Sequence, residues 1–156
     1  HRFFRTKSDL IRALAARWFD EVESTVAKAI ADAPSSDAAL RAAVLATLAI
    51  KRARFDADPV LFRAYLVLAA QHDDLVRQHT ARLSDLLRGV LDRIVPAGRV
   101  EAALALVEDA TVQFRVPAMI AQNRPHATYA RAHAVLDAVI PALATTGGVG
   151  KARDLG

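Results

Sequence analysis

Apolar residues recur every three or four positions through most of the chain, the spacing that places them on one face of an α-helix. Alternating apolar and polar stretches, which would predict strands, are missing, and the abundant alanine and leucine favour helix. The pattern therefore predicts an all-α bundle of about six helices. The first predicted helix carries an apolar stripe at four-residue spacing, formed by Leu10, Leu14, Trp18, Val22, Val26 and Ile30.

Capping residues and prolines divide this pattern into separate helices. N-caps are predicted at Thr6, at Ser35 or Ser36, and at Asp58, because each side chain can accept a hydrogen bond from a free backbone N–H. The third helix is almost wholly apolar over residues 60–70, and we expect it to be central and buried on most sides. Further breaks are predicted at 72–74, 96–98, Pro117 and 123–125, followed by a last helix over 126–144.

Positive charge gathers at the start of the chain. The formal net charge is +4, and the first seventeen positions hold the basic residues Arg2, Arg5, Lys7, Arg12 and Arg17. Basic residues clustered beside aromatic ones favour contact with nucleic-acid phosphates. The sequence also begins at His1 rather than at methionine, so we expect that a segment precedes it in the intact protein or has been cut away.

The opening ten residues read His-Arg-Phe-Phe-Arg-Thr-Lys-Ser-Asp-Leu, and residues 109–117 end in a Phe-x-x-Pro pattern. The first segment resembles the junction between recognition helix and core in TetR-family (TetR/AcrR) transcriptional regulators. The second is similar to the eighth helix of many members. His1 stands where tyrosine is usual, and Phe3 where tyrosine or histidine is usual. The positions that match the junction directly are Phe4, Thr6, Lys7 and Leu10.

The resemblance implies a domain organisation and a mechanism. Residues 1–6 would be a remnant of the recognition helix, 7–146 the ligand-binding and dimerisation domain, and 147–156 a flexible, glycine-rich tail. The implied protein is a homodimer that binds a palindromic operator as a repressor. A small molecule in the helical core would shift the helix over 6–30 and so release the protein from DNA. The implied contacts to DNA phosphates are Lys7, Thr6, His1 and Phe3.

The ligand pocket is expected among the first five helices. The large residues there predict a mostly apolar pocket, which suits a hydrophobic or aromatic small molecule. Plain core packing is the alternative for each of them, and Gln113 is a further polar candidate. The predicted pocket residues are Trp18, Arg52, Phe55, Phe62, Tyr65, His79, Leu83, Thr111, Phe114 and Arg115.

The last two helices are predicted to pair with their symmetry mates in a four-helix interface. An interface of this kind is self-complementary about a twofold axis, and the alanines at 130, 132, 134 and 138 would allow the helices to approach closely. The predicted dimer-interface residues are Phe114, Ala118, Met119, Ala132, Leu136, Val139 and Leu143.

Patterns of catalysis and metal binding do not occur in this sequence. No serine sits in a Gly-x-Ser-x-Gly turn, and the histidine pairs are seven residues apart, too far along a helix to share one ion easily. The glycine-rich stretch 147–151 lacks the first glycine and the final Ser or Thr of a phosphate loop. We therefore expect no enzymatic activity, no metal and no cofactor.

Composition favours a cytoplasmic protein without membrane contact. Cysteine is absent, and no apolar run approaches the roughly 20 residues that cross a bilayer. A stand-alone helical module that binds a small molecule or acts as an adaptor, without DNA binding, is the second hypothesis. The two hypotheses differ in the segment upstream of His1, which should carry a helix-turn-helix pattern only in the regulator.

Overall fold

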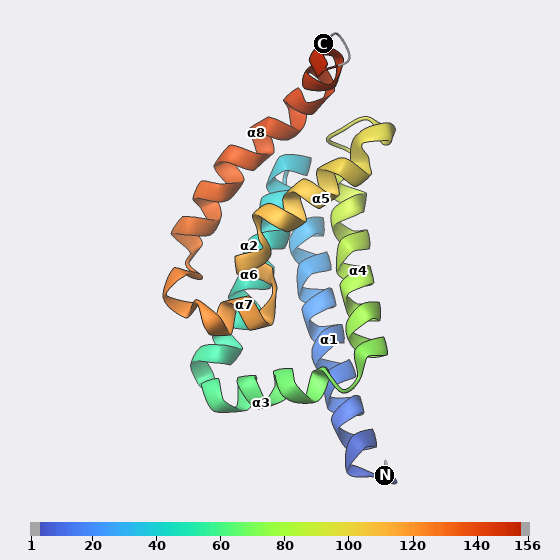
Figure 1. Cartoon of the computed structure of the whole chain (residues 1–156), viewed down its shortest axis with the longest axis vertical. Helices are drawn as coiled ribbons and strands as arrows, with labels where there is room; N and C mark the ends of the chain where they lie inside the picture. Colours follow the sequence, from blue (N-terminus) through green and yellow to red (C-terminus); the bar gives the residue numbers. More distant parts are fainter. Residues whose placement is uncertain (1–3, 154–156) are drawn as a thin grey trace.

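The computed structural model describes the backbone of residues 4–153 and the side chains of residues 4–144. Within that range the chain is all-α, as predicted, and no strand occurs (Figure 1). Two short 3-10 helices, Ala97–Arg99 and Arg124–His126, join longer elements. The helices are α1 (Lys7–Asp32), α2 (Ser36–Ala57), α3 (Pro59–Ala69), α4 (Asp73–Leu91), α5 (Val100–Ala110), α6 (Val112–Arg115), α7 (Pro117–Gln122) and α8 (Tyr129–Arg153).

The first three helices begin at the expected caps. The side-chain oxygen of Thr6 accepts from the backbone N–H of Asp9 at 3.1 Å, and Ser35, rather than Ser36, caps α2. Asp58 accepts from the N–H of Leu61 at 3.0 Å and caps α3, whose first residue is a proline. Each cap satisfies a donor that the helix itself leaves free, so the local sequence fixes where these helices start.

Helix α2 lies at the centre of the bundle. It packs against α1, α3, α4, α6, α7 and α8, and Leu40, Val44 and Leu48 on its inner face are completely buried. Helices α1 and α4 lie beside it along the long axis of the molecule, whereas α3 crosses near the end from which α1 projects (Figure 1). The core is therefore built around α2, and the residues before it and after it close over this one helix.

Helix α3 is the exception to the predicted burial. Only Phe62 is buried, while Val60 is 77% and Val67 65% exposed. The expectation of a central helix was wrong because α3 is short and lies across the edge of the bundle, where one face meets the other helices and the opposite face meets solvent (Figure 1). An unbroken apolar run does not reveal how many of its faces are covered.

The segment after α5 is divided more finely than predicted. One helix was expected from Val100 to Phe114, but α5 ends at Ala110, Thr111 separates it from α6, and Pro117 opens α7. The hydroxyl of buried Thr111 donates to the carbonyl oxygen of Val107 at 2.6 Å. The chain turns repeatedly here, and these turns bring α6 and α7 back against α2.

Helix α8 is longer than predicted. It runs from Tyr129 to Arg153 with Pro141 inside it, and so includes the glycines at 147, 148 and 150 that were expected in a flexible tail. Residues 154–156 of that predicted tail lie outside the described range, as do His1 and Phe3 at the other end. On the described part of α8, Ala132 and Leu136 are completely buried and join the core.

Candidate functional site

A cavity of about 370 Å³ lies between α3 and the inner faces of α1, α2 and α4, with α5, α6 and α7 completing its wall. Most of its lining is apolar, and its volume falls within the range of small-molecule pockets. Because α3 has only one covered face, this helix forms a thin wall between the cavity and solvent. The apolar residues that line the cavity include Trp18, Phe19, Leu61, Phe62, Tyr65, Leu66, Leu83 and Val116.

Two aromatic side chains of α1 reach this cavity, and both are held by neighbours. The guanidinium of Arg54 lies 3.9 Å from the centre of the Trp18 ring and donates to Glu21 at 2.7 Å. Phe19 stacks on the imidazole of His79, with ring centres 4.2 Å apart and an angle of 11° between the planes. The first helix therefore contributes two aromatic rings to the cavity wall, each held in place by a neighbouring side chain.

Lys51 of α2 is the most unusual residue of the cavity lining. Its side chain is 3% exposed, and its ammonium Nζ donates to the backbone carbonyl of Arg115 at 2.5 Å. Burial, together with the smaller effect of the nearby positive charge of Arg115, lowers the pKa of Lys51 to about 7. The protein thus keeps a cation, or a readily protonated amine, inside a mostly apolar cavity.

Arg115 of α6 lies beside Lys51 and is fixed by neutral acceptors. Its Nε donates to the hydroxyl of Thr111 and its Nη2 to the carbonyl of Glu108, both at 2.7 Å. The carboxylate of Glu108 instead accepts from the hydroxyl of Ser84 at 3.0 Å. Burial is the main cause that lowers the pKa of Arg115, although a guanidinium stays protonated in proteins.

His79 of α4 is tied to Glu23 of α1. The imidazole Nδ1 and the carboxylate Oε2 are 3.2 Å apart, and both residues are largely buried. Burial lowers the pKa of His79 to about 4, with Lys51 and Arg82 acting in the same direction, and burial also raises the pKa of Glu23. At neutral pH the imidazole is therefore uncharged, and one of its nitrogens is already in a hydrogen bond.

The predicted pocket residues divide into two groups. Six line the cavity, namely Trp18, Phe62, Tyr65, His79, Leu83 and Arg115. The other four do not, and for them the prediction is corrected. Arg52 covers the ring of Tyr129 at 4.4 Å, Phe55 packs behind Phe62 with ring centres 5.5 Å apart, and Thr111 is buried as the acceptor for Arg115.

Phe114, the fourth residue outside the cavity, faces the other side of the bundle. It is buried at a separate depression between α6 and α8, which Gln113, Ala134 and Val135 also line. The two faces of α6 are therefore different, since Arg115 points to the cavity and Phe114 to α8. A four-residue helix is too short for its periodicity to assign these faces from the sequence.

Sequence reasoning missed Lys51, Phe19, Ser84 and Glu108. For Lys51 a signal was present, because Val44, Leu48, Lys51 and Phe55 follow one another at the spacing of a single helical face. A lysine on the apolar stripe of a central helix is a buried lysine unless its side chain reaches solvent. Ser84 and Glu108 gave no comparable signal, since they meet only through the packing of α4 on α5.

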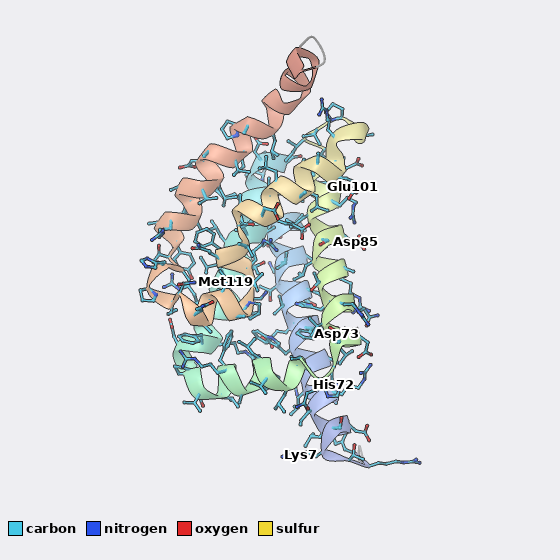
Figure 2. All side chains as sticks on the ribbon, in the orientation of Figure 1. Lys7, His72, Asp73, Asp85, Glu101 and Met119 are labelled. Atoms are coloured by element: carbon cyan, nitrogen blue, oxygen red, sulfur yellow. The ribbon has the colours of Figure 1, made fainter. Side chains whose placement is uncertain are left out.

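The N-terminal end of α1 carries the residues predicted to contact DNA phosphates. Lys7 begins the helix at the end that projects beyond the bundle (Figure 2) and is exposed together with Thr6. Arg12 is engaged elsewhere, since its guanidinium Nη2 lies 2.5 Å from Asp74 of α4 and holds the pKa of that carboxyl down at about 2. Leu10 and Leu14 are about two-fifths exposed at this end.

Most of the residues predicted at a dimer interface are buried within the single chain. The apolar stripe of α8 packs on α2 and α5 of its own chain. Ala118 is exposed but lines the cavity, and Met119 lies half-buried on α7 (Figure 2). The buried residues are Phe114, Ala132, Leu136, Val139 and Leu143.

The outward faces of these elements include small and apolar residues among charged ones such as Arg131 and Asp137. On α8 the exposed residues include Ala130, Ala134 and Ala138, and beside them Leu106 of α5 and Val112 of α6 are each more than a third exposed. No cluster of three potential metal ligands occurs in the part of the chain that the structure describes. None of the helices within the same residues combines the length and apolar character that a bilayer crossing requires.

The comparison with known protein families gives one match. Residues 36–136, from the start of α2 to the middle of α8, match the family described as the tetracyclin repressor-like C-terminal domain. No curated protein and no solved structure matches the chain significantly. The matched segment holds most of the cavity lining and excludes α1, which supplies Trp18 and Phe19.

Proposed function

The chain belongs to the tetracyclin repressor-like C-terminal domain family, and on that premise we propose that it is the effector-binding domain of a ligand-responsive, DNA-binding transcriptional repressor. One observation carries the proposal: the cavity is lined by Trp18 and Phe19 of α1, the helix that begins at Lys7. A ligand in the cavity would therefore touch the middle of the helix whose N-terminal end carries the residues proposed to face DNA.

The first helix can transmit the ligand signal as a rigid lever. Trp18 lies eleven residues from Lys7, which is roughly 16 Å along an α-helix. Arg12 lies between Lys7 and Trp18 and forms an ion pair with Asp74 of α4, which holds α1 in its place on α4. A ligand that displaces α1 as a rigid helix would have to break this pair and would also move Lys7. For release from DNA, the ligand must bind the displaced arrangement more tightly than the DNA-binding one.

The cavity proposal is tested with a neutral hydrophobic fluorophore, N-phenyl-1-naphthylamine. We expect it to bind the wild-type chain and to quench Trp18, which is the only tryptophan and lines the cavity. Ala69→Phe should fill the cavity and abolish binding. Ala64→Phe is the matched control, because Ala64 is exposed on the same helix and does not line the cavity.

The two variants separate cavity binding from surface binding. If the folded Ala69→Phe protein binds the fluorophore as tightly as Ala64→Phe does, the ligand site is not this cavity and the proposal fails. If Ala69→Phe alone loses binding, the lining residues hold the probe. Circular dichroism of both variants checks that the helical content is unchanged.

We propose that Lys7 contacts a DNA phosphate in the intact protein. The lysine lies at the N-terminal end of α1, where the free N–H groups also favour an anion. Lys7→Ala should weaken binding to every DNA sequence and lower the slope of log K against log salt by about one per contact. Lys28→Ala, at the far end of α1, should leave both unchanged, and equal effects of the two substitutions would refute the role.

We also propose a homodimer through the outward faces of α5, α6 and α8. Leu106 and Val112 are exposed there, and small alanines on α8 would allow a second copy to approach closely. Val112→Glu should give a monomer by light scattering at micromolar concentration, whereas Val60→Glu, the same change on exposed α3, should leave a dimer. A monomeric wild-type mass at that concentration would rule the dimer out.

A further inference from the structure

We infer that the cavity takes a ligand with an apolar body and a single carboxylate, whose charge is balanced by Lys51. The inference rests on the proposed function, since it names the chemical class of the effector. Its first observation is the lysine itself, which is almost completely buried, lines the cavity and has one hydrogen bond, to a backbone carbonyl. An ammonium has three N–H donors, so two remain for a ligand.

The second observation is the missing counter-charge. Within the described part of the chain, no carboxylate forms an ion pair with Lys51 or with Arg115. The lining holds two acids: the carboxylate of partly buried Glu108 accepts from Ser84, and exposed Asp58 caps α3. The negative charges of Glu108 and Asp109 act on Arg115 and raise its pKa against the effect of burial. The pKa of Lys51 is instead shifted by burial and by the positive charge of Arg115. Buried charges in proteins are normally paired, and one negative charge in the cavity would balance Lys51.

The third observation is the shape of the remaining lining. Beyond the charged end the wall consists of Trp18, Phe62, Tyr65 and Leu66, which can cover an alkyl chain or a ring but offer few polar atoms. A ligand that fits both ends is amphipathic. A neutral hydrophobic molecule of the same shape would leave two N–H donors of the buried ammonium without an acceptor, and an unsatisfied buried donor costs more than an exposed one.

The groups that face Lys51 from the surrounding helices support the same charge balance. His79 of α4 is uncharged at neutral pH because burial lowers its pKa to about 4, and Glu23 of α1 is directed at that imidazole. Arg115 of α6 stays protonated, and Glu108 of α5 is bonded to Ser84. The pKa of Lys51 itself is lowered to about 7. A bound carboxylate would raise this pKa, because a nearby negative charge favours the ammonium form.

The test compares decanoate with decanamide, which share the same chain and differ in charge. Each displaces N-phenyl-1-naphthylamine from the full chain at pH 7. We expect decanoate to displace the fluorophore at a concentration about ten- to a hundredfold lower than decanamide, as one charge-assisted contact would give. Lys51→Met should remove this preference and leave decanamide unaffected, whereas Lys28→Met, at an exposed lysine, should retain it.

A pH series on the wild-type chain gives a second test that needs no variant. Decanoate should bind more weakly as the pH rises from 7 to 9, because Lys51 loses its proton, while decanamide should show no change. Equal displacement by the two molecules, or a preference that persists in Lys51→Met, would overturn the carboxylate inference and leave the cavity proposal intact. A chain that binds no fluorophore at all would overturn both.

Discussion

Helices α2 and α3 are both rich in apolar residues, and the bundle uses them in opposite ways. The apolar face of α2 is covered by six other helices and contains completely buried leucines. Helix α3 buries only Phe62 and exposes Val60 and Val67. The cavity lies between these two helices, so one of its walls belongs to the stable core and the other to a thin outer layer.

Because of this difference, α2 should determine the stability of the fold, and α3 should determine how a ligand reaches the cavity. Local opening is easiest where few apolar contacts hold an element, which describes α3 and not α2. On the proposed function, a ligand would enter beside α3 without disturbing the core and would meet Lys51 on the α2 wall. Substitutions on α2 should act on the whole fold, and substitutions on α3 should act locally.

The largest effect is expected from a truncation in α2. Leu48→Ala should lower the free energy of unfolding by about 3 kcal/mol, because a completely buried leucine leaves a cavity in the core. Val67→Ala on the exposed face of α3 should change it by less than about 0.5 kcal/mol. Urea unfolding of both variants measures the difference, and comparable losses would contradict the division between core and outer layer.

A smaller effect is expected from the titration of Lys51. Its pKa is lowered from 10.5 to about 7 in the folded chain, so between these values the unfolded chain holds a proton that the folded chain lacks. Stability then rises with pH through that window and levels off below it. From pH 8 to 9 the titration of Lys51 should raise the free energy of unfolding by at most about 1.4 kcal/mol. This rise should be absent from Lys51→Met, and urea unfolding of both proteins at matched concentration measures it.

Wild-type and Lys51→Met curves that stay parallel from pH 7 to 10 would contradict this account of the lysine. Because His79 has a pKa of about 4, its titration falls outside the window. The difference between the two proteins therefore isolates Lys51 from the groups that titrate in both.

The smallest effects are expected at the two N-caps. Removing either cap, by Ser35→Ala on α2 or Asp58→Ala on α3, costs about 1 kcal/mol of local helix stability. In Ser35→Ala this loss should appear in the global unfolding free energy. In Asp58→Ala the loss should appear mainly as backbone hydrogen exchange about fivefold faster over 59–69. An equal rise in exchange across all helices would contradict the idea that α3 opens separately from the core.

Local signals predicted the elements well. The caps at Thr6, Ser35 and Asp58 and the break at Pro117 lie where the sequence placed them, because a cap or a proline acts on backbone groups within a few residues. Glycine was a poorer guide in α8, where the helix continues through 147–150. The burial of α3 was not predictable in this way, since it depends on which helices happen to cover it.

The cavity was predictable only in part for the same reason. Large aromatic residues such as Trp18 and Phe62 are available to line a pocket wherever they occur, but Phe55 and Phe114 look equivalent in sequence and lie outside the cavity. Which face of a helix meets the cavity is decided by tertiary packing. For Lys51, the position in the apolar stripe of α2 was a signal of burial that the sequence prediction did not use.

The central claim is that a ligand binds between α2 and α3 and touches α1. Hydrogen–deuterium exchange of the full chain, with and without saturating N-phenyl-1-naphthylamine, tests it most directly. We expect slower exchange over 59–69 and around Trp18, with no change in α8. Protection confined to the outward faces of α5 and α8, or none while the fluorophore is bound, would contradict the claim.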